Sequence, residues 1–298
     1  MSDKPNFEDW LYPPVEQPHE KKLKLKHLKI PIWTENKAKL IQRYLYYFVW
    51  VTKHGAYIDA FAGPQRMNKL DAWAAKLVLE GQPEQFFLRH YYLIELDKNK
   101  IPLLETLRDQ RPQNKKSSRI LIDVRQGDCN VVIPGFLATR PIANSEATFC
   151  LLDQRTFECH WSTVEALARY KTSGNKIELF YFLPNSWLPR AVSRTTNIER
   201  LRRWWGRDDY ATFLRLSQTK RCSQFCDRLK NDLGYAHVMP YPILEKYPGR
   251  RVMYYMIHAT DHPKAPELMT RAYNTAVYPP EPEEQLLLTL GSIENDAT

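Results

Sequence analysis

The chain has 298 residues, of which 43% are hydrophobic, and it carries a formal net charge of +9. This length and apolar content allow one large α/β domain with insertions, or two small domains, and exclude a disordered chain. The basic excess favours polyanionic partners, because a positive surface steers anions and releases their counterions. Five cysteines, with no N-terminal signal peptide and no long apolar run, predict a cytoplasmic protein outside the membrane.

Composition changes along the chain and predicts four parts. These are a mobile basic N-terminal arm (1–30), an α/β core (31–188 and 235–277), a helical Arg-rich insertion (189–234) and a loose acidic tail (278–298). The lysines at residues 21–29 form either a solvated stretch or a polyanion contact.

Apolar periodicity predicts strands that alternate with helices. The expected strands are residues 56–59, 90–95, 118–127, 147–153, 176–183 and 251–259. The expected helices outside the insertion are residues 37–51, 70–80, 98–108, 162–171 and 266–273. Alternation at this spacing indicates a Rossmann-like, doubly wound, mostly parallel sheet.

Each of the first three strands is followed by an acid: Asp59, Glu95 and Asp128. Asp59 precedes a tight turn in which Phe61 and Gly63 can approach a ligand. Because ligands bind beyond the carboxyl ends of parallel strands, we expect these five residues to bind a cofactor. The alternative is structural, with Asp59 as a cap and Asp128 as part of a Gly-Asp turn.

The three acids, in this order, resemble the motifs of class I S-adenosylmethionine-dependent methyltransferases. The chain lacks the Gly-x-Gly-x-x-Gly and Gly-Lys-Ser/Thr signatures, which disfavours a nicotinamide dehydrogenase and a P-loop enzyme. A closer resemblance, to the three-Cys-motif partner protein (TcmP) family, extends over about residues 33–277. The segments that carry it are residues 57–64, 92–97, 151–161, 177–183 and 254–263.

The family resemblance implies a methyltransferase-like fold that binds S-adenosylmethionine. It also implies a partner protein whose three-cysteine motif binds an iron–sulfur cluster, with a role in DNA repair, modification or phage defence. This chain has no Cys-x3-Cys-x2-Cys triad of its own. It is therefore expected to be the partner and not the cluster protein.

Two segments depart from the family pattern. Gln65 stands where the family often has the final Gly of Ala-Gly-Pro-Gly, and Gln154-Arg155-Thr156 replaces the end of Asp-Pro-Phe-Gly. Arg155 places a positive charge where amino-methyltransferases hold a target amine. This charge favours the binding of an anion such as phosphate at that position. Asp153, Arg155 and Glu158 are the candidate catalytic residues, and a local ion pair is the alternative for Asp153 and Arg155.

The predicted insertion contains a cluster that mixes guanidinium groups with indole. Its candidate nucleic-acid-binding residues are Arg200, Arg202, Arg203, Trp204 and Arg207. Such mixtures pair with phosphates and stack on bases. The alternative is an amphipathic helix that docks its two tryptophans on the sheet and leaves the arginines in solvent.

Cys222 and Cys226 lie one helical turn apart, without further ligands at zinc-site spacing, so we expect them to be buried and no metal to be bound. The leading functional hypothesis is a methyltransferase-like enzyme acting on nucleic acid or a nucleotide. A non-catalytic, nucleic-acid-binding accessory subunit of the iron–sulfur partner is the alternative. A Mg²⁺-dependent nuclease that uses Asp59, Glu95, Asp153 and Glu158 is a weaker one.

Overall fold

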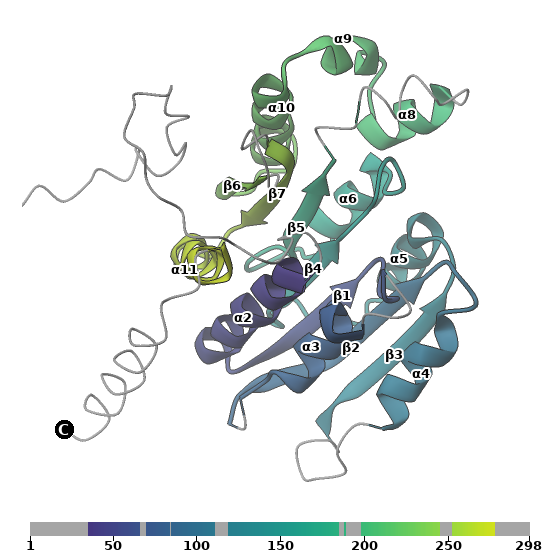
Figure 1. Cartoon of the computed structure of the whole chain (residues 1–298), viewed down its shortest axis with the longest axis vertical. Coiled ribbons are helices and arrows are strands. Elements are labelled where there is room, and N and C mark those ends of the chain that lie inside the picture. Colours follow the sequence, from purple (N-terminus) through teal and green to yellow (C-terminus); the bar gives the residue numbers. More distant parts are fainter. Residues whose placement is uncertain are drawn as a thin grey trace, which may run out of the picture. The chain divides into compact units, whose positions relative to one another are not determined.

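A computed structural model describes residues 35–65, 70–83, 85–110, 119–184, 188, 198–244 and 252–277. In these residues a seven-stranded sheet has the order β3-β2-β1-β4-β5-β7-β6 (Figure 1). The strands are β1 (His54–Asp59), β2 (Phe87–Glu95), β3 (Leu121–Gln126), β4 (Thr148–Leu152), β5 (Glu178–Leu183), β6 (His237–Leu244) and β7 (Val252–Thr260). The helices are α2 (Glu35–Thr52), η1 (Leu70–Ala72), α3 (Ala74–Glu80), α4 (Ile101–Asp109), α5 (Cys129–Ala138), α6 (Trp161–Ala168), α8 (Ile198–Trp205), α9 (Tyr210–Arg215), α10 (Gln218–Asn231) and α11 (Ala265–Val277).

Strands β1 to β5 are parallel, and β7 runs antiparallel to both β5 and β6. This arrangement confirms the predicted Rossmann-like, doubly wound, mostly parallel sheet. Strand β6 was not expected, because Pro240 and Pro242 interrupt its apolar pattern. Proline is tolerated here because β6 is an edge strand, where one side needs no ladder hydrogen bonds.

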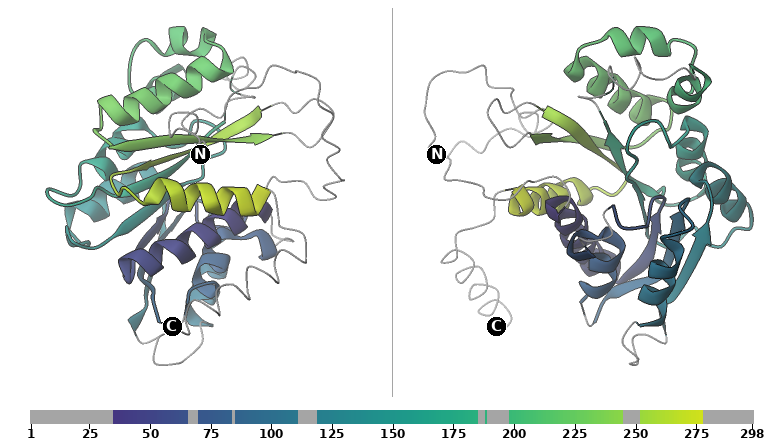
Figure 2. Two further views of the ribbon diagram at one scale, coloured as in Figure 1. Left: turned by 90° about the vertical axis from the view of Figure 1, so that its left-hand side faces the viewer. Right: turned by 45° about the vertical axis from the view of Figure 1, so that its right-hand side comes forward.

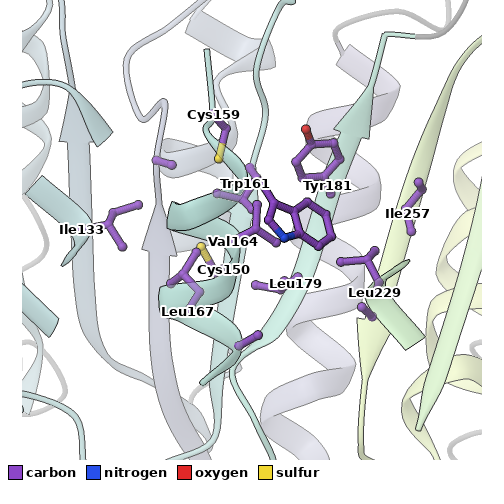
Figure 3. Close-up of a cluster of buried hydrophobic side chains, with 14 of the residues drawn as sticks. Ile133, Cys150, Cys159, Trp161, Val164, Leu167, Leu179, Tyr181, Leu229 and Ile257 are labelled. Carbon is purple, nitrogen blue, oxygen red and sulfur yellow. The ribbon is translucent and has the colours of Figure 1, made fainter. Parts of the chain in front are cut away.

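Alternate residues of the strands fill two cores, one on each face of the sheet. On β1, Ala56 and Ile58 belong to one core, which α5, α6 and α10 cover (Figure 3). Tyr57 belongs to the other core. Helices α2 and α11 lie side by side over this face of the sheet (Figure 2), and α3 and α4 complete its cover. The central strands are thus buried on both faces, which explains their nearly continuous apolar sequences.

Two expectations about helices need correction. Helix α5 was not predicted, because Pro134 and Gly135 lie inside it and both residues disfavour helix interiors. The helix expected at residues 70–80 is divided into η1 and α3, since Trp73 has an extended backbone. Its indole Nε1 donates a hydrogen bond to the carbonyl oxygen of Ala62 at 2.5 Å and so ties this break to the turn after β1.

Helices α8, α9 and α10 follow β5 in the chain and precede β6. Trp205 stacks on Phe213 with ring centroids 3.9 Å apart, and the guanidinium of Arg228 lies 3.6 Å from the Trp161 ring centroid. The predicted arm (1–30), with its basic run, and the predicted tail (278–298) lie outside the described residues. Within the described part of the chain, no helix combines the length and apolar character needed to span a membrane.

Candidate functional site

A cavity of about 820 Å³ lies beyond the carboxyl ends of β1 to β4. The predicted site residues that line it are Phe61, Gly63, Glu95, Asp128, Asp153, Arg155, Glu158, Arg200 and Arg203. The strand order reverses between β1 and β4, and doubly wound sheets bind their ligands at this switch point. The fold therefore gathers side chains from four strand ends and from α8 at one place.

Asp59 ends β1, and its carboxylate is buried in the turn that follows. Its Oδ2 accepts a hydrogen bond from the Tyr57 hydroxyl at 2.7 Å, and its Oδ1 accepts one from the Phe61 amide at 3.1 Å. Burial raises the pKa of Asp59 to about 7. Asp59 lines a small neighbouring cavity of about 20 Å³ that Phe61 and Gly63 also line. Its contacts order the turn that carries these two residues.

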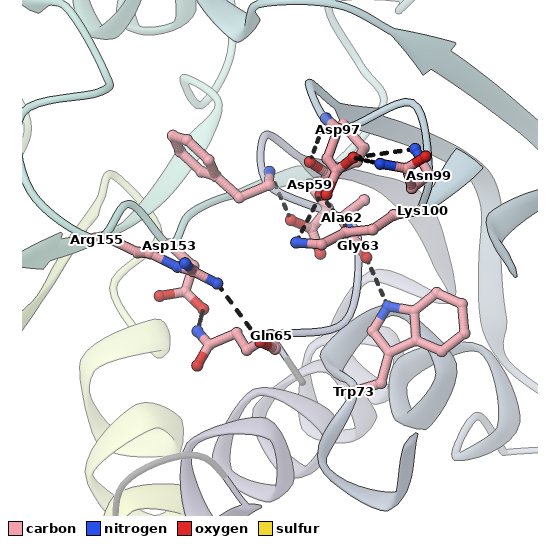
Figure 4. Close-up of polar contacts among 12 residues, drawn as sticks. Asp59, Ala62, Gly63, Gln65, Trp73, Asp97, Asn99, Lys100, Asp153 and Arg155 are labelled. Carbon is pink, nitrogen blue, oxygen red and sulfur yellow. Dashed lines mark hydrogen bonds and ion pairs between the residues drawn. The ribbon is translucent and has the colours of Figure 1, made fainter. Parts of the chain in front are cut away.

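Glu95 connects two loops at the edge of the main cavity. Its Oε2 accepts from the Gly63 amide at 2.9 Å, and its Oε1 accepts from the Asp97 amide at 2.8 Å (Figure 4). Lys100 Nζ lies 3.9 Å from the same Oε2. A Cβ at position 63 would lie only 2.3 Å from Glu95 Oε2, so glycine is required there for the close approach of this carboxylate.

Asp128 caps the N-terminus of α5, where its Oδ1 accepts from the Asn130 amide at 2.9 Å. Asn130 in turn donates to the Glu158 carbonyl oxygen at 2.7 Å and accepts from the His160 amide at 2.7 Å. The loops after β3 and β4 are thereby joined. Burial lowers the pKa of His160, which also lines the cavity; Asp128 opposes this shift, and Arg203 and Arg200 add to it.

Asp153 follows β4 and forms an ion pair with Lys37, which the sequence did not suggest, while Arg155 adds a weaker attraction to the same carboxylate. Lys37 Nζ lies 2.5 Å from Asp153 Oδ2 and 4.2 Å from the centroid of the Phe182 ring. Burial raises the pKa of Asp153, and Lys37 and Gln65 counteract this rise. Lys37 comes from the first turn of α2, so local sequence could not identify it as the partner.

The two glutamines that depart from the family pattern both have structural partners. Gln65 Nε2 donates to Asp153 Oδ2 at 2.9 Å, and its carbonyl oxygen accepts from Arg155 Nη2 at 3.5 Å (Figure 4). Gln154 is buried, donates to the Phe182 carbonyl oxygen at 3.2 Å and accepts from the Cys159 amide at 3.0 Å. These departures therefore shape the loop after β4.

Trp204, predicted to stack on bases, is only 1% exposed, and its indole donates to the Tyr181 hydroxyl at 2.8 Å. That prediction is wrong, because the apolar face of α8 docks on the sheet. The arginines of α8 and of the turn after it lie next to carboxylates. The ion pairs are Arg200–Glu158 (3.6 Å), Arg202–Glu199 (3.1 Å), Arg202–Asp208 (2.9 Å), Arg203–Glu199 (3.1 Å) and Arg207–Asp232 (2.7 Å). Their positive charge is locally balanced, which weakens the case for a phosphate-binding surface on α8.

A second polar cluster, which the sequence did not reveal, lies at the opposite end of β5. Glu178 is buried there and accepts from the hydroxyl of Tyr44, from His258 Nε2 at 2.8 Å and from Thr260 Oγ1 at 2.9 Å. Three donors around one carboxylate offset much of its desolvation cost. This cluster joins α2, β5 and β7, and it borders a cavity of about 170 Å³.

Cys222 and Cys226 are buried in the core, as the sequence predicted. Within the described part of the chain, no group of three or more His, Cys, Asp or Glu side chains is arranged to hold a metal ion. The acids of the nuclease hypothesis, Asp59, Glu95, Asp153 and Glu158, therefore do not form such a group.

Neither a protein-family model nor a curated protein matches this chain. Among solved structures, it is similar to one described as "Putative hemolysin from Streptococcus thermophilus", with a TM-score of 0.36 and 12% sequence identity. The match covers 78% of this chain and 73% of that chain. Arguments about function therefore depend on the geometry of the cavity.

Proposed function

We propose that this protein binds S-adenosylmethionine in the main cavity and is a methyltransferase-like protein that acts on nucleic acid or a nucleotide. The observation that carries the proposal is the position of the cavity at the switch point between β1 and β4, with acids at the ends of β2 and β3. The resemblance to the TcmP family extends the proposal to an iron–sulfur partner in DNA repair, modification or phage defence.

The charge of the cavity supports a cationic ligand such as a sulfonium ion. Six carboxylates line it: Glu95, Asp97, Asp128, Asp153, Glu158 and Glu199. Four basic side chains line it: Lys100, Arg155, Arg200 and Arg203. Lys37 Nζ pairs with Asp153, so five cations oppose six carboxylates, and 6 − 5 leaves an excess of one carboxylate that favours cations slightly over anions.

The residues on the acidic side suit the hydroxyl and amine groups of such a cofactor. Each oxygen of Glu95 accepts one backbone N–H and keeps a lone pair for a ribose hydroxyl. Asp128 is exposed at the cavity wall and can accept from an amine. When bound, S-adenosylmethionine supplies an electrophilic methyl group. On the substrate side, Arg155 is exposed and can pair with a phosphate or carboxylate.

Calorimetric titration with S-adenosylhomocysteine tests the cofactor assignment. The wild type should bind, and Glu95→Gln should weaken binding about tenfold or more, because a charge-assisted hydrogen bond contributes about 1.5–3 kcal/mol. Glu199→Gln, which changes a carboxylate of α8 that lines the same cavity, is the matched control and should leave the affinity within about twofold. Absence of binding by folded wild-type protein would refute the proposal.

One observation favours the alternative of a non-catalytic accessory subunit. The carboxylate of Asp153 is already engaged by Lys37 and Gln65, so it is not free to orient a substrate amine. A reaction with methyl-labelled S-adenosylmethionine and oligonucleotides separates the two functions. Cofactor binding without label transfer would favour the accessory role, whereas transferred label would establish catalysis.

A further inference from the structure

Helix α2 presents a regular row of basic and aromatic side chains to solvent. This row, which we call the α2 stripe, consists of Lys39, Arg43, Tyr46, Trp50 and Lys53, the last just past the end of the helix. The spacing of four, three, four and three residues keeps all five on one side of a helix. The opposite face of α2 is buried in the core, so the stripe faces away from the sheet.

The aromatic part of the stripe is exposed to an unusual degree for large rings. Tyr46 is 38% exposed and Trp50 is 43% exposed. The two ring centroids lie 6.2 Å apart, and Trp50 contacts the edge of Phe86 with centroids 5.2 Å apart. The rings therefore hold one another in place and leave surfaces on which an unpaired base can stack.

The basic part of the stripe differs from the arginines of α8. Within the described residues, Arg43, Lys53 and the nearby Arg271 have no carboxylate partner within 4.0 Å, whereas the α8 arginines are paired. Lys53 Nζ lies 4.2 Å from the Phe86 ring centroid, and Arg271 lies 5.3 Å from that of Tyr47. Cations on aromatic faces remain available to phosphate groups.

We propose that the α2 stripe binds single-stranded nucleic acid. Tyr46 and Trp50 stack on bases, and Arg43, Lys53 and Arg271 pair with phosphates. A single strand fits better than a duplex, because exposed rings need unpaired bases as partners. Lys37, at the other end of the same helix and about 24 Å from Lys53 along its axis, pairs with Asp153 at the main cavity.

This inference uses the nucleic-acid part of the proposed function and does not depend on methyl transfer. The test is fluorescence anisotropy with a labelled single-stranded oligonucleotide of about 20 nucleotides, in the absence of cofactor and over a range of salt concentrations. Arg43→Ala with Lys53→Ala should lower the slope of log affinity against log salt by about 1.4, or 0.7 for each lost phosphate contact. Trp50→Ala should weaken binding about tenfold without changing the slope.

The matched control is Arg202→Ala with Arg207→Ala, which removes two arginines that already have carboxylate partners. The control should change neither affinity nor slope. Trp50→Tyr keeps an aromatic face and should restore most of the binding lost in Trp50→Ala, which separates stacking from misfolding. Absence of oligonucleotide binding by the wild type, or loss of binding only in the α8 control, would overturn the proposal. Failed cofactor binding with intact oligonucleotide binding would refute the methyl-donor assignment alone.

Discussion

Replacing Asp59 by asparagine should make the protein more stable at neutral and alkaline pH. Burial raises the pKa of Asp59 from 3.8 to about 7, and its hydrogen bonds to Tyr57 and Phe61 only partly oppose this rise. The folded state therefore binds more protons than the unfolded state between about pH 4 and pH 7. Stability falls as pH rises through that window, and the penalty is complete above pH 7.

The size of the effect follows from the shift. About three pKa units at 1.36 kcal/mol each correspond to an upper limit of about 4 kcal/mol. In Asp59→Asn, Oδ1 can still accept from the Phe61 amide, and the Tyr57 hydroxyl can accept from the new amide group. The free energy of unfolding of the variant relative to wild type should therefore rise by up to about 4 kcal/mol from pH 4 to pH 8.

Urea unfolding measured at intervals between pH 4 and pH 8 gives this difference directly. Asp208→Asn is the control, because the side chain of Asp208 is 91% exposed and its replacement should give a nearly flat difference. Parallel pH profiles for wild type and Asp59→Asn would show that Asp59 is not destabilised by burial. A free energy of unfolding that falls in the variant relative to wild type as the pH rises would contradict the argument.

Three further substitutions test the site and the helix beside it. Lys37→Met removes the cation next to the partly buried carboxylate of Asp153 and should cost up to about 3 kcal/mol in urea unfolding at pH 8. Because the pKa of Asp153 is raised, the cost should fall as the pH is lowered. Trp204→Ala should cost about 3–5 kcal/mol in the same assay, and a cost typical of surface sites would contradict its burial. Arg155→Lys should change the free energy of unfolding by less than about 0.5 kcal/mol, because Arg155 is exposed. It should nevertheless abolish most transfer of labelled methyl groups, because lysine lacks the planar fork of arginine. Full transfer by the variant would exclude a contact between Arg155 and the substrate.

The spacing of apolar residues along the sequence was sufficient to predict the parallel part of the sheet. The expected strand at residues 90–95 lies within β2, and the helix expected at residues 37–51 lies within α2. The periodicity of apolar residues can be recognised within one segment, without knowing which other elements that segment packs against. The acids after β2 and β3 also lie on one cavity, because parallel strands end at the same edge of a sheet.

The helical stretch at residues 198–205 shows what local pattern leaves open. The sequence allowed either nucleic-acid binding by Trp204 or docking of the tryptophans on the sheet. The structure shows docking, because Trp204 is buried and its indole donates a hydrogen bond to the Tyr181 hydroxyl on β5, 23 residues earlier in the chain. The sequence also left open whether Arg202 and Arg207 bind phosphate or pair within the protein. In the structure they form ion pairs with Asp208 and Asp232.

The sequence by itself determined the fold class, the strands that carry the site and four of the acids that line the main cavity, but not that Asp59 lies outside it. Tertiary structure alone decided that Asp153 pairs with Lys37 across more than one hundred residues, that β7 runs antiparallel, and that the arginines of α8 lie next to carboxylates. The physical reason is that periodicity and turn chemistry act between neighbours in the chain. Ion pairs and burial depend on distances that exist only after the sheet has assembled.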